Sequence, residues 1–224
     1  MTHRIALIHP LQPAMRAAGE AFARHWPEAR CINILDDSLP ADLAREGATA
    51  PSLYKRIQDL IRYAMELQVS GILFTGSGFG PVIEELAPTL AIPLLKPNQA
   101  MFEDAFRIGK RIGMLVSFPA AADAMRQDFE SAAKAAGALA TLEIAAVPQA
   151  FAQLQAGNAE AHNRLLANAA RGLAQCDAIL LAQFSTAQAE PTVAAAVPRP
   201  VLTSPGSAVK KLRKLVEARG VTNR

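Results

Sequence analysis

The feature that most constrains the fold is a repeat, because short sequence patterns in the first half of the chain recur 107 residues later. A single match between apolar runs carries little information, and coincidence in an alanine-rich chain is the alternative explanation. Several matches at one constant offset indicate a duplicated architecture. The matched segments are Arg4–Ile8 with Arg111–Leu115, Ile72–Leu73 with Ile179–Leu180, Pro93 with Pro200, Leu95 with Leu202, and Phe22 with Phe129.

Each half of the chain is predicted to alternate strands with helices. The strands are continuous apolar runs, as is typical of parallel sheets buried on both faces. They are expected near residues 4–9, 30–35, 71–75, 92–95, 111–116, 140–146, 178–182 and 200–203, with helices near 12–26, 52–68, 80–90, 120–137, 159–175 and 186–196. Alternating strands and helices imply right-handed crossovers. We therefore predict an α/β fold with two pseudo-symmetric, doubly wound parallel-sheet domains related by an internal repeat.

The repeat also predicts the domain boundaries. A chain of 224 residues is long enough for two small domains of about 100 residues each. We expect the first half over residues 1–97 and the second over 98–205. A helical segment follows the last strand of each half, at residues 98–109 and 206–219. The first segment links the halves, and the second is expected to dock on the first half.

The composition excludes two classes of function. The net charge is only +3, and aromatic residues make up 5% of the chain. The single basic cluster contains Lys210, Lys211, Arg213 and Lys214. We interpret it as the solvated face of a helix, and we do not expect nucleic-acid binding. The amino-terminal apolar stretch is too short for a secretion signal, and no stretch is long enough to span a bilayer, so we expect a cytoplasmic location and no membrane association.

Open parallel sheets bind ligands beyond the carboxyl ends of their strands, so the loops at those ends are the candidate site. Two of them lead into helices, whose free N–H groups favour an anion such as a carboxylate or phosphate. The alternative is that their hydroxyl groups only cap helices. The selected residues are His9 and Pro10, Thr75–Gly78, Lys96, Ser117 and Phe118, Gln183–Thr186, and Thr203 and Ser204.

Cofactor signatures are missing from these loops. The stretch Gly76–Gly80 does not have the spacing of the glycine-rich dinucleotide or nucleotide motifs, and it is not a nucleophile elbow. The four histidines and two cysteines are not at metal-ligand spacing. We therefore expect neither a cofactor nor a metal.

With these loops in view, the chain resembles the aspartate/glutamate/hydantoin racemase superfamily, on its hydantoin-racemase and arylmalonate-decarboxylase side. The segments that carry the resemblance are Asn33–Leu39 (NILDDSL), Ile72–Pro81 (ILFTGSGFGP), Pro93–Asn98 (PLLKPN) and Ile179–Ser185 (ILLAQFS). The resemblance implies two similar α/β domains and chemistry at the carbon next to a carboxylate, without a cofactor. It also implies that the racemases use two cysteines, one from each domain, as opposed acid and base, and that the decarboxylase uses one.

The resemblance places the first of these cysteine positions at Gly76 and the second at Gln183. Neither side chain can take up a proton at neutral pH. The two cysteines present, Cys31 and Cys176, lie near the starts of predicted strands, at the end of the sheet opposite the candidate site. We interpret both as buried structural thiols, so the residues contradict a two-thiol racemase.

The carboxylate-binding positions that the resemblance implies are better preserved. Thr75 and Ser77 would hold a carboxylate, Ser117 and Ser185 would close from the other half, Gln183 would orient the carboxylate, and Pro10 would shape the pocket wall. The remaining titratable groups near strand ends are His9, Asp37 and Lys96. Each is a candidate base if buried, although each is equally explained as a salt-bridge or turn residue.

Two hypotheses about function follow. The first is an isomerase, racemase or decarboxylase of amino acid metabolism that acts on a small carboxylic acid with a base other than cysteine. The second is a relative that binds a carboxylate without catalysis. The sequence identifies neither the substrate nor the oligomeric state, and a homo-oligomer remains open.

Overall fold

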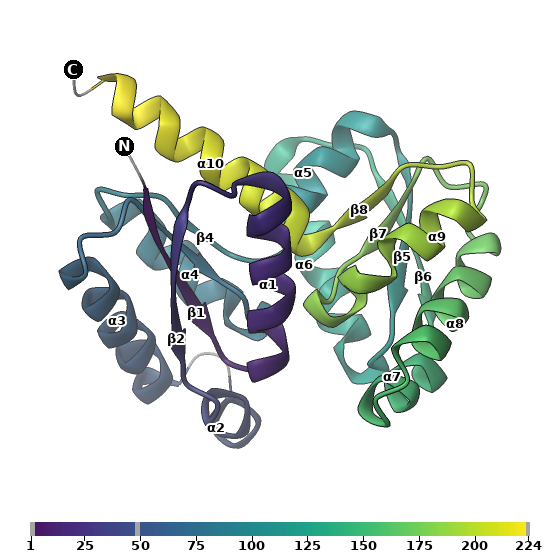
Figure 1. Ribbon diagram of the computed structural model, residues 1–224, viewed down its shortest axis with the longest axis horizontal. Coiled ribbons are helices and arrows are strands. Elements are labelled where there is room, and N and C mark those ends of the chain that lie inside the picture. Colours follow the sequence, from purple (N-terminus) through teal and green to yellow (C-terminus); the bar gives the residue numbers. More distant parts are fainter. Residues whose placement is uncertain (1–2, 48–49, 223–224) are drawn as a thin grey trace. The chain divides into compact units, whose positions relative to one another are not determined.

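The structure is a computed structural model that describes residues 3–47 and 50–222, without the side chains of Ser77, Ala120 and residues 220–222. The chain divides into two compact units. The first unit contains Met1–Pro97 and Ala208–Arg224, and the second contains Asn98–Ser207. Each unit is built around its own four-stranded parallel sheet (Figure 1). The predicted α/β class and the two parallel sheets are therefore confirmed.

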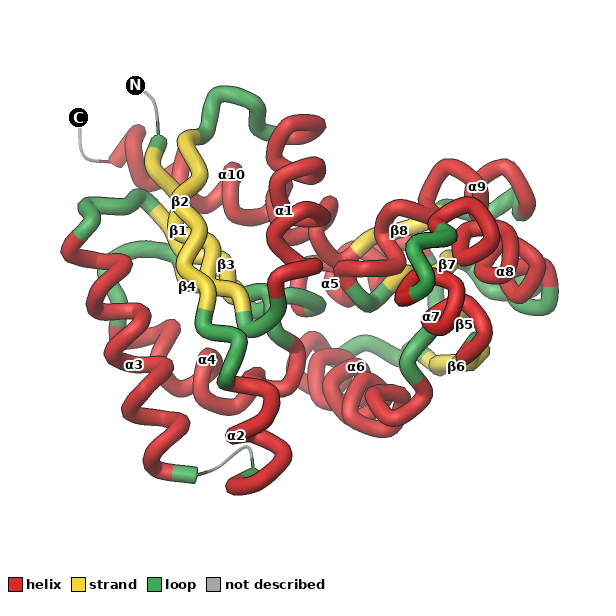
Figure 2. The backbone as a smooth tube through the Cα atoms, turned by 60° about the horizontal axis from the view of Figure 1, so that its bottom comes forward, coloured by secondary structure: helices red, strands yellow, loops and turns green. Residues whose placement is uncertain are grey.

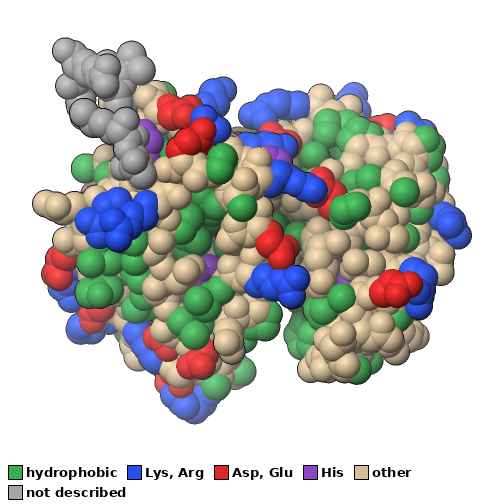
Figure 3. Space-filling model, viewed as in Figure 1, with side chains coloured by type: hydrophobic (Ala, Val, Ile, Leu, Met, Phe, Trp, Pro, Cys, Tyr) green, Lys and Arg blue, Asp and Glu red, His purple; other side chains and the backbone are tan. Residues whose placement is uncertain are grey.

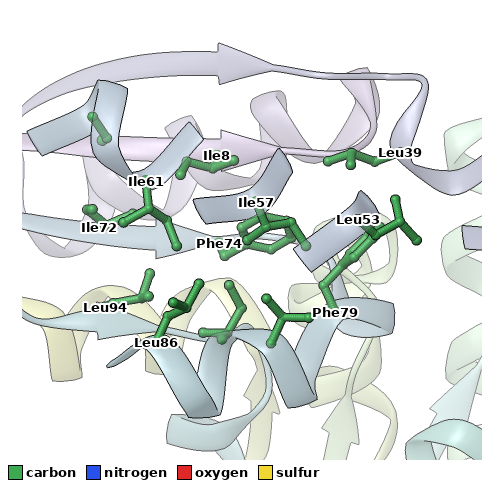
Figure 4. Packing of buried hydrophobic residues seen from close by; sticks show 14 of the residues in the cluster. Ile8, Leu39, Leu53, Ile57, Ile61, Ile72, Phe74, Phe79, Leu86 and Leu94 are labelled. Carbon is green, nitrogen blue, oxygen red and sulfur yellow. The ribbon is translucent and has the colours of Figure 1, made fainter. Parts of the chain in front are cut away.

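The sheet of the first unit has the strand order β2-β1-β3-β4. Its strands are β1 (Arg4–His9), β2 (Arg30–Leu35), β3 (Gly71–Phe74) and β4 (Leu94–Leu95), and its helices are α1 (Gln12–His25), α2 (Leu39–Glu46), α3 (Pro51–Glu66), α4 (Gly80–Leu86) and α10 (Ser204–Thr222). The hydrophobic core between this sheet and α2, α3 and α4 includes Ile8, Ile57, Phe74 and Phe79 (Figure 4). Because side chains alternate along a strand, the other sheet face is left for α1 and α10.

Helix α10 packs on β3 because Gly71 leaves space for it. A β-carbon added at Gly71 would lie 3.0 Å from Leu212 Cδ1 and 3.1 Å from Val216 Cγ2. Arg213 of the same helix donates to the carbonyl oxygen of His25 at 3.1 Å. From Ala208 onward, α10 is therefore part of the first unit, although most of that unit precedes residue 98.

The sheet of the second unit has the corresponding order, β6-β5-β7-β8. Its strands are β5 (Arg111–Val116), β6 (Thr141–Ala146), β7 (Ala178–Leu181) and β8 (Val201–Thr203), and its helices are α5 (Gln99–Ile108), α6 (Ala122–Ala136), α7 (Pro148–Gln155), α8 (Ala159–Arg171) and α9 (Glu190–Ala196). One core joins the sheet to α7, α8 and α9, and a second core joins its other face to α5 and α6. The helices therefore cover both faces of the sheet (Figure 2).

The strands of the two sheets pair in the same register, offset by the 107 residues of the sequence repeat. Ile5 pairs with Gly71 in the first sheet, and Ile112 pairs with Ala178 in the second, 107 residues further on in both strands. The β3–β4 and β7–β8 pairs keep the same offset. The strand β6 departs from it, since it begins four residues beyond residue 137, where the offset would place it. The difference lies in the connection between the first two strands of the second unit.

Two helices were not predicted. These are α2 and α7, each of 8 residues and each with a proline in its first turn. Both follow the second strand of their unit, so they are equivalent in the repeat. A helix of two turns shows too little periodicity to stand out in a sequence, and its stability comes from packing on a core rather than from its own residues. Leu39 of α2 and Ala150 of α7 are both fully buried in this way.

The charges of the surface are mixed in sign. On the face shown in Figure 3, Lys and Arg side chains lie among Asp and Glu side chains. In the part of the chain that the structure describes, no helix is long and apolar enough to cross a membrane. Among the same residues, no group of three or more His, Cys, Asp or Glu side chains is arranged to hold a metal ion.

Candidate functional site

The first group of candidate residues lies at the carboxyl edge of the first sheet, where β1 and β3 end side by side. His9 is the last residue of β1, and Thr75 directly follows β3. His9 Nδ1 lies 2.9 Å from Thr75 Oγ1, and His9 Nε2 lies 2.9 Å from Asn33 Oδ1 of β2. His9 and Thr75 are both buried. Three neighbouring strands thus hold a hydroxyl, an imidazole and an amide in one line of hydrogen bonds.

The strand register explains this meeting. His9 pairs with Leu35 and Leu7 pairs with Asn33, so His9 and Asn33 point to the same face of the sheet as diagonal neighbours. The backbone N–H of Thr75 donates to Ile8 O at 2.9 Å, which extends the β1–β3 pairing by one residue and fixes the threonine beside His9. The imidazole is therefore held from both sides by neutral groups.

Burial sets the charge of His9. The loss of solvent lowers the pKa of its imidazole below the ordinary value, and the hydrogen bond to Asn33 only partly opposes this effect. His9 is therefore a neutral base near pH 7. Of the three titratable candidates predicted at strand ends, it is the one that the structure buries among neutral partners.

The other two titratable candidates are placed differently. The ammonium group of Lys96 forms an ion pair with Glu84, and its side chain is only 12% exposed. Asp37 is exposed. Its neighbour Asp36 is the residue that forms an ion pair, with Arg56 at 2.7 Å. These contacts match the salt-bridge interpretation for Lys96, and they leave Asp37 without a structural link to His9.

Gly76, the position that matches a family cysteine, is closely surrounded. A β-carbon added there would collide with the ring of Pro10, and it would lie 3.1 Å from atoms of Phe74 and of Phe79. Pro10, which is predicted to shape the pocket wall, packs its ring against the backbone of Gly76. The backbone of Ser77 begins a short 3₁₀ turn, Ser77–Phe79, but its side chain lies outside the described part of the structure.

A second group of candidate residues lies at the carboxyl edge of the second sheet. Three donors converge there on one oxygen, Oε1 of Gln183: the N–H of Ser117 at 2.8 Å, the hydroxyl of Ser117 at 2.8 Å, and the N–H of Phe118 at 3.3 Å. Ser117 is fully buried, and it directly follows β5. We call these three groups the Ser117 donor site.

The hydroxyl groups of Thr186 and Thr203, in the other loops, bond within their own turns. Thr186 donates to Gln183 O at 2.8 Å, and Thr203 Oγ1 accepts from the N–H of Gly206 at 3.2 Å in the first turn of α10. Ser185 is half-buried, and its carbonyl oxygen accepts from Gln188. The capping interpretation therefore explains Thr203, whereas the Thr186 hydroxyl bonds a carbonyl of its own turn and caps no N–H group. It does not explain Thr75 or Ser117, which bond to His9 and to Gln183.

The two thiols lie at the opposite ends of the strands. Cys31 is the second residue of β2, and Cys176 precedes β7 by two residues. Burial raises the pKa of Cys31 to about 11, and burial followed by the charge of Glu143 raises the pKa of Cys176. Cys176 is buried as predicted, whereas Cys31 is only half-buried. Both thiols therefore lie at the amino ends of their strands, whereas His9 and Ser117 lie at carboxyl ends.

Asn33 is the site residue that sequence analysis missed as a separate candidate. It is the one amide in β2 (Arg30–Leu35), and it stands between two apolar residues, Ile32 and Ile34. A polar side chain between apolar residues of a strand is a usable signal, but only the pairing of β2 with β1 shows that it reaches His9.

Comparison with known proteins identifies the family. The sequence model of the Asp/Glu/Hydantoin racemase family matches residues 14–212, so the chain belongs to this family. Allantoin racemase from Klebsiella pneumoniae has a similar structure, with a TM-score of 0.75, 16% identity, and coverage of 97% of this chain and 89% of that one. No curated protein sequence matches the chain.

Two further structures extend this likeness. Aspartate racemase from Picrophilus torridus has a TM-score of 0.74 at 14% identity, covering 96% of this chain and 94% of that one. Arylmalonate decarboxylase has a TM-score of 0.64 at 15% identity, covering 95% and 92%. These likenesses concern the fold, which is the two-sheet α/β architecture described above.

Proposed function

We propose that this protein binds a small carboxylic acid and acts at the carbon next to the carboxylate, without the two-cysteine mechanism. The observation that carries the proposal is the Ser117 donor site. Two backbone N–H groups and one hydroxyl aimed at a single oxygen are the arrangement that a carboxylate oxygen requires. Family membership supplies the general class of reaction.

Gln183 Oε1 stands in for the ligand oxygen in this proposal. An amide oxygen carries a smaller negative charge than a carboxylate oxygen, so the same three donors would bind a carboxylate more strongly. The amide satisfies them when the ligand is absent, since buried donors without partners are costly. A bound acid therefore has to displace the Gln183 side chain, or to share the donors with it.

The chemistry must use a group other than a thiol. The family's two cysteine positions correspond to Gly76 and Gln183 by resemblance, and neither residue exchanges a proton at neutral pH. The raised pKa values of Cys31 and Cys176 keep both thiols protonated. In contrast, the lowered pKa of His9 keeps its imidazole neutral and able to accept a proton.

The experiment combines binding with isotope exchange. Malonate and phenylmalonate are titrated by calorimetry into the wild-type protein and into the Ser117→Ala variant, which loses one donor. We expect binding that weakens about tenfold in the variant, the equivalent of one hydrogen bond to a charged group. Release of CO₂ from phenylmalonate and incorporation of deuterium into 2-phenylpropionate in D₂O test for chemistry. Unchanged affinity in Ser117→Ala would refute the binding site.

The second candidate function is carboxylate binding without catalysis. It is favoured by the collision that blocks a side chain at Gly76 and by the occupation of the Ser117 donor site. The two candidates differ in one result, because a binding protein would bind malonate and phenylmalonate with the Ser117 dependence given above, yet it would exchange no deuterium at any pH.

A further inference from the structure

We infer that Thr75 is the proton-transferring residue of this protein, and that His9, oriented by Asn33, receives and returns the proton through the Thr75 hydroxyl. The inference rests on the proposed function, because it supplies the acid–base group that the missing thiols leave open. Thr75 is the catalytic residue in this scheme, and His9 and Asn33 are positioning residues.

The geometry is that of an activated hydroxyl. A side-chain hydroxyl becomes reactive when a base lies within hydrogen-bond distance and a third group orients that base. Thr75 Oγ1, His9 Nδ1 and Nε2, and Asn33 Oδ1 satisfy both conditions, with 2.9 Å at each of the two contacts. The order of hydroxyl, imidazole and amide matches the nucleophile, base and orienting group of hydrolytic triads. The two ring nitrogens have exchanged places, because here Nδ1 faces the hydroxyl and Nε2 faces the orienting group.

The hydrogen bonds remain satisfied in both protonation states. In the neutral state, Nε2–H donates to Asn33 Oδ1, and the Thr75 hydroxyl donates to Nδ1. After protonation, Nδ1–H donates to Thr75 Oγ1, and the hydroxyl turns to donate to Ile8 O, which lies 3.3 Å away. Asn33 Oδ1 accepts in both states, so it fixes the tautomer that leaves Nδ1 free to receive the proton.

The proton balance is closed within the three residues. In the abstraction step, the C–H bond next to the substrate carboxylate breaks, its proton moves to Thr75 Oγ1, and the electron pair stays on the carbon as an enediolate. The hydroxyl proton of Thr75 moves to His9 Nδ1 in the same step, which gives an imidazolium. Return of the proton reverses both transfers. A decarboxylation starts instead from the imidazolium form of His9: the C–C bond breaks, CO₂ leaves, the carbanion takes the proton of the Thr75 hydroxyl, and Nδ1–H of His9 replaces that proton, which leaves His9 neutral.

The charged groups around His9 are already engaged. Asp36 follows β2 at this edge and donates its backbone N–H to His9 O at 3.0 Å, but its carboxylate is bound by Arg56. At the start of α1, Arg16 pairs with Glu20 at 2.8 Å on the exposed surface. Lys96, beyond β4, pairs with Glu84. Residues 75–80, which follow β3, carry no charged side chain. The side chains in hydrogen-bond contact with the imidazole are therefore the neutral groups of Thr75 and Asn33.

The first test compares two substitutions at Thr75. Thr75→Val keeps the shape and removes the hydroxyl, whereas Thr75→Ser keeps the hydroxyl. Deuterium incorporation into 2-phenylpropionate and CO₂ release from phenylmalonate are measured with malonate affinity. We expect kcat to fall about 10²- to 10⁴-fold in Thr75→Val, as for the loss of general acid–base catalysis, and to stay within about tenfold in Thr75→Ser. Thr89→Val is the matched control, because its hydroxyl also donates to a backbone carbonyl, Leu86 O at 2.7 Å.

The second test is the pH profile. Abstraction needs neutral His9, so kcat/KM should fall as the pH drops through the lowered pKa of His9, below about 6.5. Asn33→Asp places a carboxylate against Nε2, which raises that pKa and should move the acidic limb to higher pH. His9→Gln should lose as much kcat as Thr75→Val, and the double variant should lose little more.

The outcomes separate this inference from the proposed function. If malonate does not bind to the wild-type protein, the proposed function is refuted. Exchange that is equal in Thr75→Val and Thr75→Ser, or an acidic limb that Asn33→Asp does not move, would overturn the relay alone. Intact carboxylate binding without exchange of either probe would also overturn it and favour the non-catalytic alternative.

Discussion

The ring of Pro10 occupies the space that a β-carbon on Gly76 would need. Phe74 and Phe79 close the same space from two further sides, and their rings pack edge to face at 5.4 Å. A cysteine at this position therefore requires more than a change of one residue. The absence of a thiol at residue 76 is therefore built into the packing around it.

The first prediction concerns this packing. Gly76→Cys alone should lower the free energy of unfolding by about 1–3 kcal/mol, the usual cost of forcing extra atoms into a packed site. Adding Pro10→Ala removes the ring and should recover most of that loss. Urea denaturation of the two variants and of Pro10→Ala measures both effects. Full stability of Gly76→Cys by itself would show that the Pro10 loop moves easily.

Thiol chemistry at residue 76 should likewise depend on removing the Pro10 ring. If Gly76→Cys and Gln183→Cys are introduced together, racemisation of aspartate or glutamate should appear only when Pro10→Ala is also present. The wild-type protein should racemise aspartate, glutamate and hydantoins negligibly. Wild-type turnover comparable to that of a racemase would show that the acid–base groups are misassigned.

The second prediction concerns the occupant of the Ser117 donor site. Gln183→Ala removes the amide oxygen that competes with a ligand, so malonate should bind about 10- to 100-fold more tightly, as expected for the removal of three competing hydrogen bonds worth up to about 1 kcal/mol each. Without malonate the variant should melt at a lower temperature, because the buried donors lose their partner, and malonate should restore the melting temperature. Calorimetry and thermal unfolding measure these changes.

Gln188→Ala is the matched control for this prediction. Gln188 lies in the same turn, but its side chain donates to Ser185 O at 3.0 Å rather than to the donor site. Its malonate affinity should equal that of the wild-type protein. Weaker malonate binding in Gln183→Ala would instead mean that the amide orients the ligand, the role that the resemblance implied.

Most of the fold was predictable from the sequence because the repeat places the same pattern twice. Strands β1, β2 and β5 have the predicted bounds, and the other strands differ by one or two residues at an end. Helix α9 was predicted to begin at residue 186, but the segment Phe184–Ala189 is a 3₁₀ turn and α9 begins at Glu190. Boundaries of this kind depend on which carbonyl each N–H reaches, and the apolar pattern does not carry that information.

The site was predictable only at the level of loops. The rule that ligands bind at the carboxyl ends of strands selected the loops of His9, Thr75, Ser117 and Gln183 without any coordinates. It did not indicate that His9 contacts Asn33, because the partner lies on another strand and depends on register. It also did not indicate that Gln183 fills the Ser117 donor site. Side-chain rotamers and strand register determine both contacts, and neither leaves a mark in the sequence.

The third prediction concerns His162 and pH. His162, in the first turn of α8, is fully buried, and its Nε2 has no hydrogen-bond partner in the structure. Burial lowers its pKa, and the hydrogen bond with Asn163 only partly opposes this. The unfolded chain therefore binds a proton more readily than the folded one. The stability that neutral His162 contributes is fully present above about pH 6.5 and is lost as the pH falls from there through the lowered pKa.

His162→Leu tests this sign. The variant has no group to protonate, so its free energy of unfolding should fall less than that of the wild-type protein between roughly pH 7 and pH 5. Urea denaturation at several pH values gives the two curves, with His3→Leu as a control at a histidine that is half-exposed. Parallel curves for the wild-type protein and His162→Leu would mean that His162 binds its proton equally readily in the folded and the unfolded protein.

The last prediction is that both cysteines are irrelevant to activity. A thiol with a pKa of about 11, as at Cys31, is a thiolate in only about one molecule in a thousand at pH 8. Cys176 is fully buried, and its raised pKa also favours the neutral thiol. Iodoacetamide at pH 8 should therefore modify the folded protein far more slowly than the same protein in urea.

Cys31→Ala and Cys176→Ala should each bind malonate and exchange deuterium as the wild-type protein does. Cys176→Ala should lose about 1 kcal/mol of stability, because it removes a sulfur atom from the core of α8 and α9. The melting temperature separates that loss from a loss of function, and activity that disappears in either variant while the fold persists would assign a thiol to the chemistry after all.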